Sequence, residues 1–386
     1  MDPSPRLLYL MNEALFFTTH RMPVALAARD AGFEVHVAAP YMAGAVETIR
    51  AHGFRYHDLP LDRGSLRPLA ELRLLRAFHA LIREVRPDLL HAVAMKPVLY
   101  GGLLARLNRV PAVVHAITGL GYLFLRQSLG AKLMRGLVTR LYRHALGHPN
   151  ARAIFQNPDD LGLFLERRLV DPARAVTIKG CGVDLAQFRP APESQGPVTV
   201  MFPARLIGDK GVREFVAAAE IIGREGSAAR FVLVGRNDPQ NPTNVPEAEI
   251  RDWERRGMVE WWGFRNDMAA TLGQAHVVAM PSYREGLPRV LIEAAACGRP
   301  IVSADVPGCR EIVREGENGL LVPARDARAL AGAIRRLIDD ASLRRRLGER
   351  GRAIAEAEFS VEHLVAAHMA LYRALLPGQG NPVQGA

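Results

Sequence analysis

The sequence predicts an α/β protein with two Rossmann-like domains facing across a cleft, each a parallel sheet wrapped by helices. Three observations support this prediction. The chain has 386 residues, too many for one ordinary core and suited to two domains of roughly 150–200 residues. Short apolar runs alternate with longer amphipathic stretches, as strands and helices do in parallel sheets. This rhythm stops at a polar, Pro- and Gly-containing stretch, residues 187–197, and then starts again.

Six apolar runs in the first half are expected to form strands, with helical periodicity between them. The expected strands are residues 7–10, 34–40, 89–94, 112–118, 152–157 and 175–179, and the expected helices are 21–31, 69–84 and 132–145. The polar stretch that follows reads as a linker. We therefore assign residues 1–190 to the first domain.

The second half repeats the pattern. The expected strands are residues 199–204, 230–235, 259–263, 277–281, 300–304 and 319–322, and the expected helices are 212–225, 289–297 and 327–338. Residues 191–358 form the expected second domain. An apolar pattern over 361–375 then predicts a final helix within the remaining segment, residues 359–386. We expect this helix to pack back on the first domain.

The composition excludes several classes of protein. No run of about 18 uncharged apolar residues occurs, so a transmembrane helix is not expected. The N-terminus has no basic segment followed by an apolar stretch and a cleavage site, which argues against secretion. Cys181, Cys297 and Cys309 lack metal-ligand spacing and are expected to be reduced thiols. These features predict a cytoplasmic protein.

The positive charge is concentrated in the first half of the chain. Residues 1–190 hold 25 Lys and Arg against 15 Asp and Glu, whereas residues 191–386 hold 25 of each. The asymmetry indicates that the first half faces something anionic. A general enrichment in Arg over Lys is the equal alternative.

Residues 122–144 are both basic and amphipathic. The cations that alternate with leucines in this stretch are Arg126, Lys132, Arg135, Arg140 and Arg143. Such a helix can lie in a headgroup layer, where each cation contributes about 1 kcal/mol with anionic lipid. It can equally pack its leucine face on the sheet and leave its arginines in water. Both alternatives stay open.

Loops at the carboxyl ends of the strands are the first place to look for a site, because open α/β sheets bind ligands there. The expected strand ending at Ala204 is followed by Arg205, Lys210 and Gly211, and then by a helix. The two cations can neutralise a diphosphate, and free backbone N–H groups can bond to it. This loop is therefore a candidate diphosphate clamp.

A second candidate follows the fourth expected strand of the second domain. Glu285 lies in the loop, and Glu293 lies inside the helix that begins near Pro288, a residue suited to the first turn. Two carboxylates at different depths can each accept hydrogen bonds from vicinal hydroxyls. The amides of Gly286 and Leu287 can meet an anion or a sugar oxygen. Because apolar residues flank Glu293, we expect it to be buried and to need a partner.

These residues, in this order, resemble glycosyltransferase family 4. The matching pattern is Arg205, Lys210-Gly211, Gly263-Phe264, Pro281-Ser282, Glu285-Gly286-Leu287-Pro288, Glu293-Ala294, Gly298, Pro300, Gly316 and Asn318-Gly319-Leu320-Leu321-Val322. Members of the family are retaining, metal-independent enzymes of the GT-B fold that use nucleotide-activated sugars. The resemblance covers nearly all of residues 198–325.

The resemblance implies roles for the matching residues on the donor side. Arg205 and Lys210 would hold the donor diphosphate. Glu285 would contact hydroxyls of the donor sugar, and Glu293 would take the ribose hydroxyls. The loop around Gly263 and Phe264 would border the nucleobase.

The first half is similar to one branch of the family, the bacterial enzymes that extend saccharides on undecaprenyl diphosphate. The matching stretches are residues 16–23, 96–102 and 118–122. They imply that a UDP-linked N-acetylhexosamine or related sugar passes to a lipid-linked saccharide, in the assembly of surface polysaccharide or glycoprotein glycans. With the basic first half, this favours peripheral association with the anionic inner face of the cytoplasmic membrane.

Two of these stretches supply acceptor-side candidates. Lys96 follows an expected strand, where it could meet an acceptor phosphate. Tyr100 belongs to the same stretch. Gly119 and Gly121 belong to the third stretch and are further acceptor-binding candidates.

Two histidines are candidates for a catalytic imidazole. Many family members carry a histidine near the end of the fifth strand of the first domain, which points to His115. A histidine satisfied within the strand is the equal alternative there. His20 is the second candidate, because it lies in the loop after the first expected strand.

The expected chemistry is electrostatic. Departure of the nucleoside diphosphate builds up negative charge, which Arg205 and Lys210 can stabilise. No carboxylate pair of the hydrolase type is evident, so a front-face displacement fits the family better than a double displacement. No Asp-X-Asp cluster occurs in a suitable loop. We therefore expect neither a required metal nor a cofactor.

Other functions remain as alternatives. A sugar-nucleotide epimerase, a transferase with a soluble acceptor and a non-catalytic nucleotide-sugar binding protein would share the two-domain fold. A nucleic-acid reader is suggested by the isoelectric point near 10.0, but the basic half has no reading motif or aromatic platform. A dehydrogenase is disfavoured because Asn12-Glu13-Ala14 stands where a G-x-G-x-x-G motif would follow the first strand.

Overall fold

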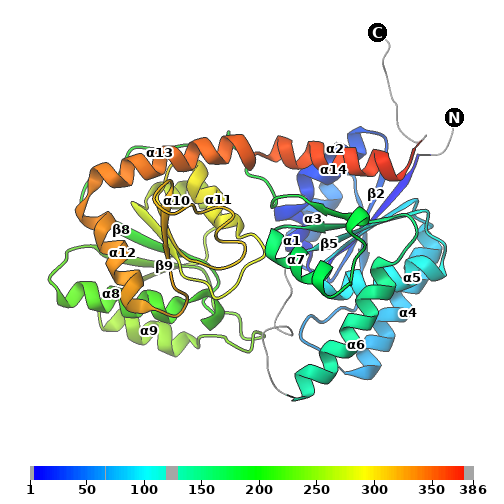
Figure 1. The fold of residues 1–386 in the computed structure, drawn as a ribbon, viewed down its shortest axis with the longest axis horizontal. Coiled ribbons are helices and arrows are strands. Elements are labelled where there is room, and N and C mark those ends of the chain that lie inside the picture. Colours follow the sequence, from blue (N-terminus) through cyan, green and yellow to red (C-terminus); the bar gives the residue numbers. More distant parts are fainter. Residues whose placement is uncertain (1–3, 66, 119–128, 378–386) are drawn as a thin grey trace, which may run out of the picture. The chain divides into compact units, whose positions relative to one another are not determined.

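The computed structural model describes residues 4–65, 67–118 and 129–377. The chain divides into two compact units (Figure 1). The first unit comprises Met1–Cys181 and Glu362–Ala386, and the second comprises Gly182–Val361. Each unit is built on one parallel sheet, of seven strands in the first and six in the second.

The sheet of the first unit has the strand order β3-β2-β1-β4-β5-β6-β7. Its strands are β1 (Arg6–Leu10), β2 (Glu34–Ala39), β3 (Arg55–Asp58), β4 (Leu89–Val93), β5 (Ala112–Ile117), β6 (Ala151–Phe155) and β7 (Ala175–Thr177). All neighbouring pairs are parallel. The order reverses between β1 and β4, which is where doubly wound folds open a ligand crevice.

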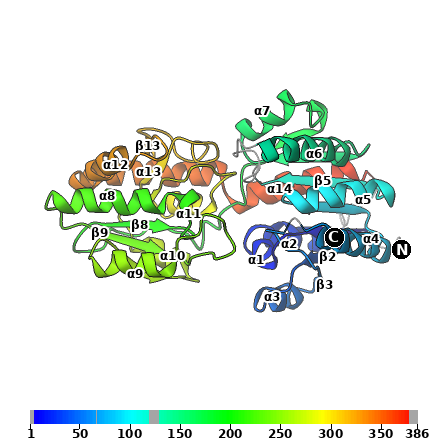
Figure 2. The ribbon, with the colours of Figure 1, turned by 90° about the horizontal axis from the view of Figure 1, so that it is seen from below.

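Helices cover both faces of this sheet. They are α1 (Ala14–His20), α2 (Met22–Asp30), α3 (Ala45–Ala51), α4 (Pro68–Val85), η1 (Pro97–Gly101), α5 (Gly102–Leu107), α6 (Leu129–Leu146), α7 (Pro158–Glu166), η3 (Pro172–Arg174) and α14 (Val361–Leu375). Helices α1, α2, α3 and α14 share one core, and Figure 2 shows the first three grouped together. Helices α4 and α5 pack in a second core, and α6 and α7 in a third.

The final helix packs on the first unit, as the sequence predicts. Leu364, Met369 and Tyr372 of α14 lie in the same core as the side chains of β1 and β4. The Tyr372 hydroxyl is 2.9 Å from the Tyr9 hydroxyl and 2.6 Å from Nδ1 of His91. Apolar packing and a buried hydrogen-bond network therefore join the end of the chain to its first strand.

The sheet of the second unit has the order β10-β9-β8-β11-β12-β13. Its strands are β8 (Thr199–Pro203), β9 (Arg230–Val234), β10 (Glu260–Gly263), β11 (Val277–Met280), β12 (Ile301–Ala304) and β13 (Gly319–Val322). Its helices are η4 (Gly208–Lys210), α8 (Val212–Arg224), α9 (Glu247–Arg255), α10 (Met268–Gly273), α11 (Arg289–Ala296), α12 (Ala327–Asp339) and α13 (Ala341–Glu358). Helices α8 and α12 lie side by side in one core (Figures 1 and 2), and α11 shares another with the end of α13.

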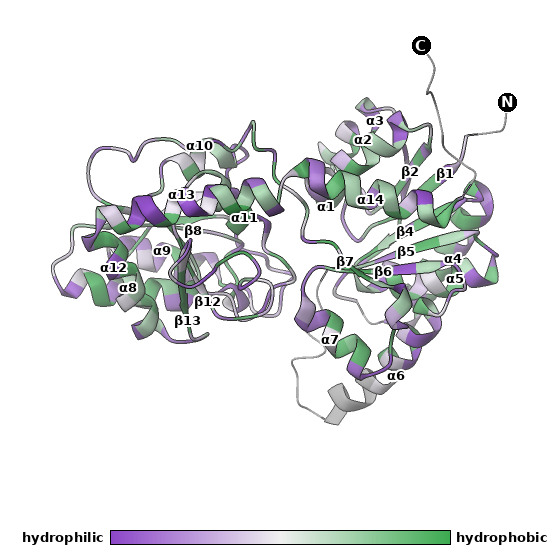
Figure 3. Ribbon diagram, turned by 45° about the horizontal axis from the view of Figure 1, so that its top comes forward, coloured by the Kyte–Doolittle hydropathy of each residue, from purple (hydrophilic) through white to green (hydrophobic). Residues whose placement is uncertain are grey.

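The apolar runs that the sequence analysis took for strands are the strands of the structure. Figure 3 shows hydrophobic residues concentrated in both sheets, whereas the outer faces of helices such as α13 are hydrophilic. Strand β3 was not expected, because its sequence Arg-Tyr-His-Asp contains no apolar run and its side chains are exposed or half-buried. The short helices α1, α3, α5, α7 and α10 also lacked enough turns for a clear periodicity.

The unit boundary differs from the expected one. The second unit begins at Gly182 rather than at residue 191. Val183 and Phe188 are buried in a core of the second unit, and Glu193 pairs with Arg344 at 2.8 Å. The stretch that looked like a free linker is therefore packed against the second unit.

The described part of α6 bears on whether this helix lies in a headgroup layer or packs its leucine face on the sheet. Val138, Tyr142 and Leu146 are buried in the same core as Phe155 of β6. Arg140 is exposed, and Arg143 donates to backbone carbonyls at the end of α7, at 3.0 and 3.2 Å. From residue 138 onward the helix thus packs its apolar side on the sheet. Residues 122–128 lie outside the described residues.

We predict that acid destabilises the first unit through its buried histidines. Burial lowers the pKa of His115 to about 3, whereas an unfolded imidazole titrates near 6.5. Below about pH 6.5 the unfolded chain therefore binds a proton that the folded chain does not, and the free energy of unfolding falls. This one histidine should cost about 2 kcal/mol between pH 7 and pH 5.

Hydrogen exchange of the β5 amides at both pH values measures this effect. His115→Leu should reduce the difference between the two pH values by about 2 kcal/mol. His363→Asn, at an exposed position on α14, serves as the control and should leave the difference unchanged. An unchanged pH dependence in His115→Leu would contradict the prediction.

Candidate active site

The loops at the carboxyl edge of the second sheet come into close backbone contact. Gly211 has φ +76°, and a Cβ there would lie 2.2 Å from the carbonyl oxygen of Pro281. Only glycine allows the loop after β8 to approach the loop after β11 in this way. The approach brings Lys210 and Glu285, 75 residues apart in sequence, into one ion pair with 2.5 Å between Nζ and Oε1.

This ion pair is largely withdrawn from solvent. The side chains of Lys210 and Glu285 are 20% and 10% exposed. Removing one member of such a pair leaves an uncompensated charge, which typically costs about 3–5 kcal/mol when it is buried. The carboxylate therefore holds the ammonium group at the strand ends. From there the two groups can contact a bound anion and neighbouring hydroxyls.

Arg205 is the more exposed cation of the same edge. Its side chain is 48% exposed, and its Nη1 donates to Oδ2 of Asp238 at 2.7 Å. The neighbouring amide, that of Leu206, donates to the carbonyl of Arg236 at 2.9 Å, so the loops after β8 and β9 are joined. The sequence analysis did not identify Asp238, because a partner 33 residues away leaves no local pattern.

Gly263 and Phe264 continue this edge beyond β9. The carbonyl of Gly263, which has φ +70°, accepts from the amide of Gly235 at 2.9 Å. Phe264 is 55% exposed, and Cζ of Arg236 lies 5.2 Å from the centroid of its ring. An exposed aromatic ring beside a guanidinium offers a flat surface for a planar ligand.

Glu293 is buried, as expected, and the structure provides its partner. The residue is 6% exposed on α11, and Nε of Arg289 lies 2.6 Å from its Oε1. Burial raises the pKa of Glu293, and Arg289 opposes that rise. Arg289 stands four residues before Glu293 on the same helix. The i, i+4 spacing is therefore the sequence signal for this pair.

The segment from Gly286 to Pro288 supports Glu285. A Cβ on Gly308 would lie 2.5 Å from the carbonyl oxygen of Gly286, so the loops after β11 and β12 also touch. Leu287 is buried in a core of the second unit. Pro288 is the N-cap of α11 rather than a residue of its first turn.

Tyr283 adds a second contact between the loops at this edge, which the sequence analysis missed. Its amide donates to the carbonyl of Asp209 at 2.9 Å, and its hydroxyl donates to Glu214 at 2.6 Å. Cζ of Arg325 lies 4.5 Å from the centroid of its ring. Burial raises the pKa of the Asp209 carboxyl, whereas the hydrogen bond with Thr243 and the charge of Arg325 act to lower it. Arg325 therefore adds another cation to this edge.

In the first unit, Lys96 and Tyr100 share a partner that was not expected. Nζ of Lys96 donates to Oε1 of Glu71 and to the carbonyls of Asp62 and Ser65, each at 2.7 Å. The hydroxyl of Tyr100 donates to Oε2 of Glu71, also at 2.7 Å. An ammonium has three donors, and all three are used here. In this structure Lys96 therefore holds a loop against α4, and its contact with an acceptor phosphate stays a prediction.

His115 also differs from its expected role. It lies within β5, not at its carboxyl end, and is fully buried against Gly102 and Ala145. Burial, followed by the neighbouring His148, lowers its pKa. An imidazole enclosed in this way is a core residue, so we withdraw it as a catalytic candidate.

His20 keeps an accessible position. It ends α1, is half-buried, and stacks on Phe16 with 4.0 Å between ring centroids. Its Nδ1 lies 2.7 Å from Oγ1 of Thr19. Gly119 and Gly121, the other acceptor-side candidates, lie outside the described residues.

Metal and membrane features can be stated for the described residues. Within residues 4–65, 67–118 and 129–377, no group of three or more His, Cys, Asp or Glu is arranged to hold a metal ion. In the same ranges no helix is both long and apolar enough to cross a membrane.

Cys309 lies close to Glu285, and burial raises the pKa of its thiol to about 12.

Two family models match the chain. The one described as Glycosyl transferase 4-like covers residues 6–156, and the one described as Glycosyl transferases group 1 covers residues 197–340. The chain belongs to the glycosyltransferases. The second of these matches includes every donor-side candidate from Arg205 to Glu293.

Relatives of this glycosyltransferase include two curated bacterial enzymes. The Campylobacter jejuni N,N'-diacetylbacillosaminyl-diphospho-undecaprenol alpha-1,3-N-acetylgalactosaminyltransferase is 28% identical over 343 residues, or 85% of this chain and 88% of the relative. The Escherichia coli UDP-Gal:alpha-D-GlcNAc-diphosphoundecaprenol alpha-1,3-galactosyltransferase is 25% identical over 285 residues, or 70% and 72% of the two chains.

Solved structures share the fold of the glycosyltransferase. Sucrose-phosphate synthase from Thermosynechococcus elongatus superposes with a TM-score of 0.77 at 23% identity, covering 96% of this chain and 99% of the other. Anabaena Alr3699/HepE in complex with UDP and glucose gives 0.75 at 18% identity, covering 96% and 100%. The expected fold of two Rossmann-like domains is thereby confirmed.

We predict that Lys210→Met lowers the turnover of glycosyl transfer by about 100-fold or more, because the leaving group loses a positioned positive charge. Lys210→Arg keeps the charge and should retain more of the rate. The measurement is initial-rate kinetics with saturating donor, and a thermal melt of each variant tests for unfolding caused by the unpaired Glu285.

Arg230→Met is the control for this prediction. It removes an exposed cation of the same unit that pairs with Glu260 at 2.7 Å. Exposed pairs of this kind contribute about 1 kcal/mol or less, so turnover should not change. Equal rates for Lys210→Met and the unaltered protein would exclude the assigned role.

Proposed function

We propose that this glycosyltransferase moves a sugar, an N-acetylhexosamine or a related sugar, from a UDP-sugar to a saccharide linked to polyprenyl diphosphate, with retention of anomeric configuration. The observation that supports the donor side most directly is the Lys210–Glu285 pair at the strand ends. It combines a cation for a phosphate with a carboxylate for sugar hydroxyls in one place.

The other donor contacts follow from the same edge. Arg205 is half-exposed and can exchange Asp238 for a phosphate oxygen. Glu293, oriented by Arg289, would accept hydrogen bonds from the ribose hydroxyls. The exposed ring of Phe264, next to Gly263, would border the uracil.

The proposed reaction needs no protein nucleophile. The bond between the anomeric carbon and the β-phosphate oxygen breaks while the acceptor hydroxyl forms its bond on the same face of the sugar. The leaving phosphate oxygen takes the proton of that hydroxyl. Lys210 and Arg205 stabilise the negative charge that develops on the diphosphate. Metal-independent catalysis is consistent with membership of this family.

The acceptor is proposed from the relatives. The names of the Campylobacter jejuni and Escherichia coli relatives both contain an undecaprenol-diphosphate-linked saccharide. The excess of basic residues in the first 190 positions favours peripheral association with an anionic inner membrane surface. His20 is the remaining histidine candidate on this side, and Gly119 and Gly121 stay proposed acceptor contacts.

The test of this proposal is release of nucleotide from a panel of UDP-, GDP- and ADP-sugars. Each is incubated in EDTA, with and without a saccharide on polyprenyl diphosphate. We expect release of UDP that requires the lipid-linked acceptor and is unaffected by EDTA. Release with a soluble acceptor alone would contradict the proposed acceptor. A changed sugar still bonded to its nucleotide would indicate an epimerase, and no turnover with nucleotide-sugar binding would indicate a binding protein.

We also predict that Glu293→Gln weakens binding of the nucleotide sugar. The substitution keeps the shape of the side chain but removes the charge that orients Arg289 and accepts from the ribose. KM for the donor should rise by about tenfold, the loss expected when a hydrogen bond to a charged group becomes neutral. Substrate-dependent initial rates give KM and kcat separately.

Glu311→Gln is a suitable control for Glu293→Gln. It removes a carboxylate from a half-buried position of the same unit, outside the candidate donor contacts. Its KM should match that of the unaltered protein. An unchanged KM in Glu293→Gln would remove the ribose contact from the proposal.

A further inference from the structure

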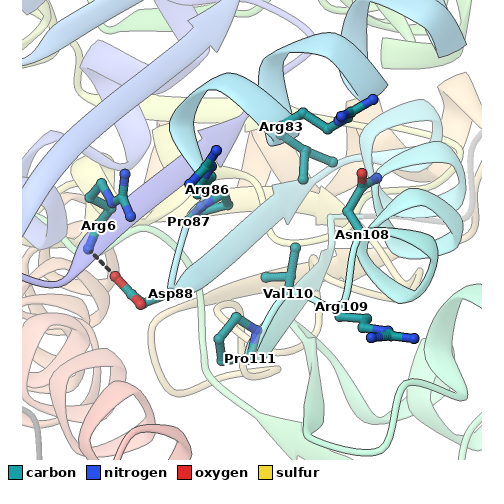
Figure 4. Close-up of a pocket in the computed structure, with 10 residues that line it drawn as sticks. Arg6, Arg83, Arg86, Pro87, Asp88, Asn108, Arg109, Val110 and Pro111 are labelled. Carbon is teal, nitrogen blue, oxygen red and sulfur yellow. Dashed lines mark hydrogen bonds between the residues drawn. The ribbon is translucent and has the colours of Figure 1, made fainter.

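A pocket lined by arginines opens at the amino-terminal edge of the first sheet. Its volume is about 490 Å³, and it lies where β1, β4 and β5 begin and where α4 and α5 end. The four arginines that line it are Arg6, Arg83, Arg86 and Arg109. Figure 4 shows them together with Pro87, Val110 and Pro111, which also line the pocket.

The lining of this pocket carries more cations than carboxylates. Within the part of the chain that the structure describes, none of the four guanidinium groups makes an ion pair. The one carboxylate in the lining, Asp88, accepts from the backbone amide of Arg6 at 2.8 Å. The carbonyl ends of α4 and α5 add about half a negative charge each. Four positive charges exceed these contributions, so the pocket is net cationic.

Two of these arginines stand in a backbone conformation that ordinarily selects glycine. Arg86 caps α4 with φ +47°, and Arg109 follows the cap of α5 with φ +54°. Residues with a Cβ are strained in this left-handed region, which is why helices commonly end there on glycine. Both positions place an arginine in the lining of one pocket.

The frame of the pocket is rigid. The amide of Asp88 donates to the carbonyl of Arg6 at 2.9 Å, and the amide of Ala112 donates to the carbonyl of Asp88 at 3.1 Å. Nδ2 of Asn108 is bonded to the carbonyl of Leu104 at 2.8 Å. The strand starts around the pocket are therefore fixed before any ligand arrives, which lowers the entropic cost of binding.

We propose that this pocket is a binding site for a phosphate group, carried by an anionic phospholipid headgroup or by a soluble phosphate. Guanidinium groups bind phosphate through paired, charge-assisted hydrogen bonds. The site is separate from the candidate donor site, which belongs to the second unit. Leu107, adjacent to Asn108 in the chain, is 69% exposed, which favours the lipid source.

The chain provides a matched control for testing the pocket. Arg168 follows the cap of α7 with φ +51°, and its amide bonds to the carbonyl three residues earlier, as that of Arg109 does. It does not line the pocket. Arg109→Gly and Arg168→Gly therefore remove the same charge from the same backbone conformation, and glycine relieves the strain in both. Neither variant should melt at a lower temperature than the unaltered protein.

Binding is measured with two probes. The first is sedimentation with vesicles of phosphatidylcholine, with or without phosphatidylglycerol. The second is calorimetric titration with pyrophosphate, made in the Lys210→Met background so that the candidate donor site does not contribute. Arg109→Gly and Arg86→Gly should each weaken binding by about fivefold, the loss expected for one near-surface cation. Arg168→Gly should change it by less than about twofold.

The outcomes distinguish a lipid headgroup from a soluble phosphate and include the results that would contradict the proposal. Loss confined to the phosphatidylglycerol vesicles assigns the site to a lipid headgroup, and loss in the pyrophosphate titration assigns it to a soluble phosphate. Equal losses in Arg109→Gly and Arg168→Gly, or no binding of either probe, would overturn the proposal. Nucleotide release with a detergent-dispersed acceptor should be unchanged in the pocket variants, so this test is independent of the proposed transfer reaction.

Discussion

Close backbone contact between loops is the constraint on which the candidate active site depends. Three glycines at the carboxyl edge of the second sheet make it possible. A Cβ would lie 2.2 Å from a carbonyl oxygen at Gly211, 2.0 Å at Gly235 and 2.5 Å at Gly308. At these distances no side chain fits. Because the loops after β8, β9, β11 and β12 meet through these positions, residues far apart in sequence become one charged surface.

The electrostatic organisation of the two units differs. The charged residues that the sequence predicts on the donor side have opposite partners: Lys210 has Glu285, Arg205 has Asp238, and Glu293 has Arg289. In such a site a ligand anion can take the place of an internal carboxylate, which then loses its charged partner. Among the described residues, the arginines of the pocket in the first unit make no ion pair, so a phosphate there would supply a missing charge. The donor-side groups therefore suit a ligand that replaces an internal partner, whereas the arginine pocket suits an anion that adds a missing charge.

Helix α14 packs on the core of the first unit, and this packing explains why several polar groups there are buried. Arg21, Tyr9, His91 and Tyr372 are fully enclosed between the first strands and α14. Burial lowers the pKa of Arg21 and His91 and raises that of Tyr372. Tyr372 pairs with Tyr9 and His91 inside a core that includes residues from the first strand and the last helix. A polar residue type alone is thus a poor indicator of a site.

The sequence by itself determined the two parallel sheets, the final helix and the loops that carry Arg205, Lys210, Glu285 and Glu293. Apolar runs and helical periodicity are local, and strand ends follow from them. Only the tertiary structure decided that Arg205 pairs with Asp238 and Lys210 with Glu285, because pairing across 33 or 75 residues leaves no local pattern. Strand β3 also came only from the structure, because its sequence contains no apolar run. The tertiary structure also placed His115 in the core and gave Lys96 three acceptors, since burial and hydrogen-bond partners are consequences of packing. The arginine pocket arises in the same way, from three strand starts and two helix ends that only the fold brings together.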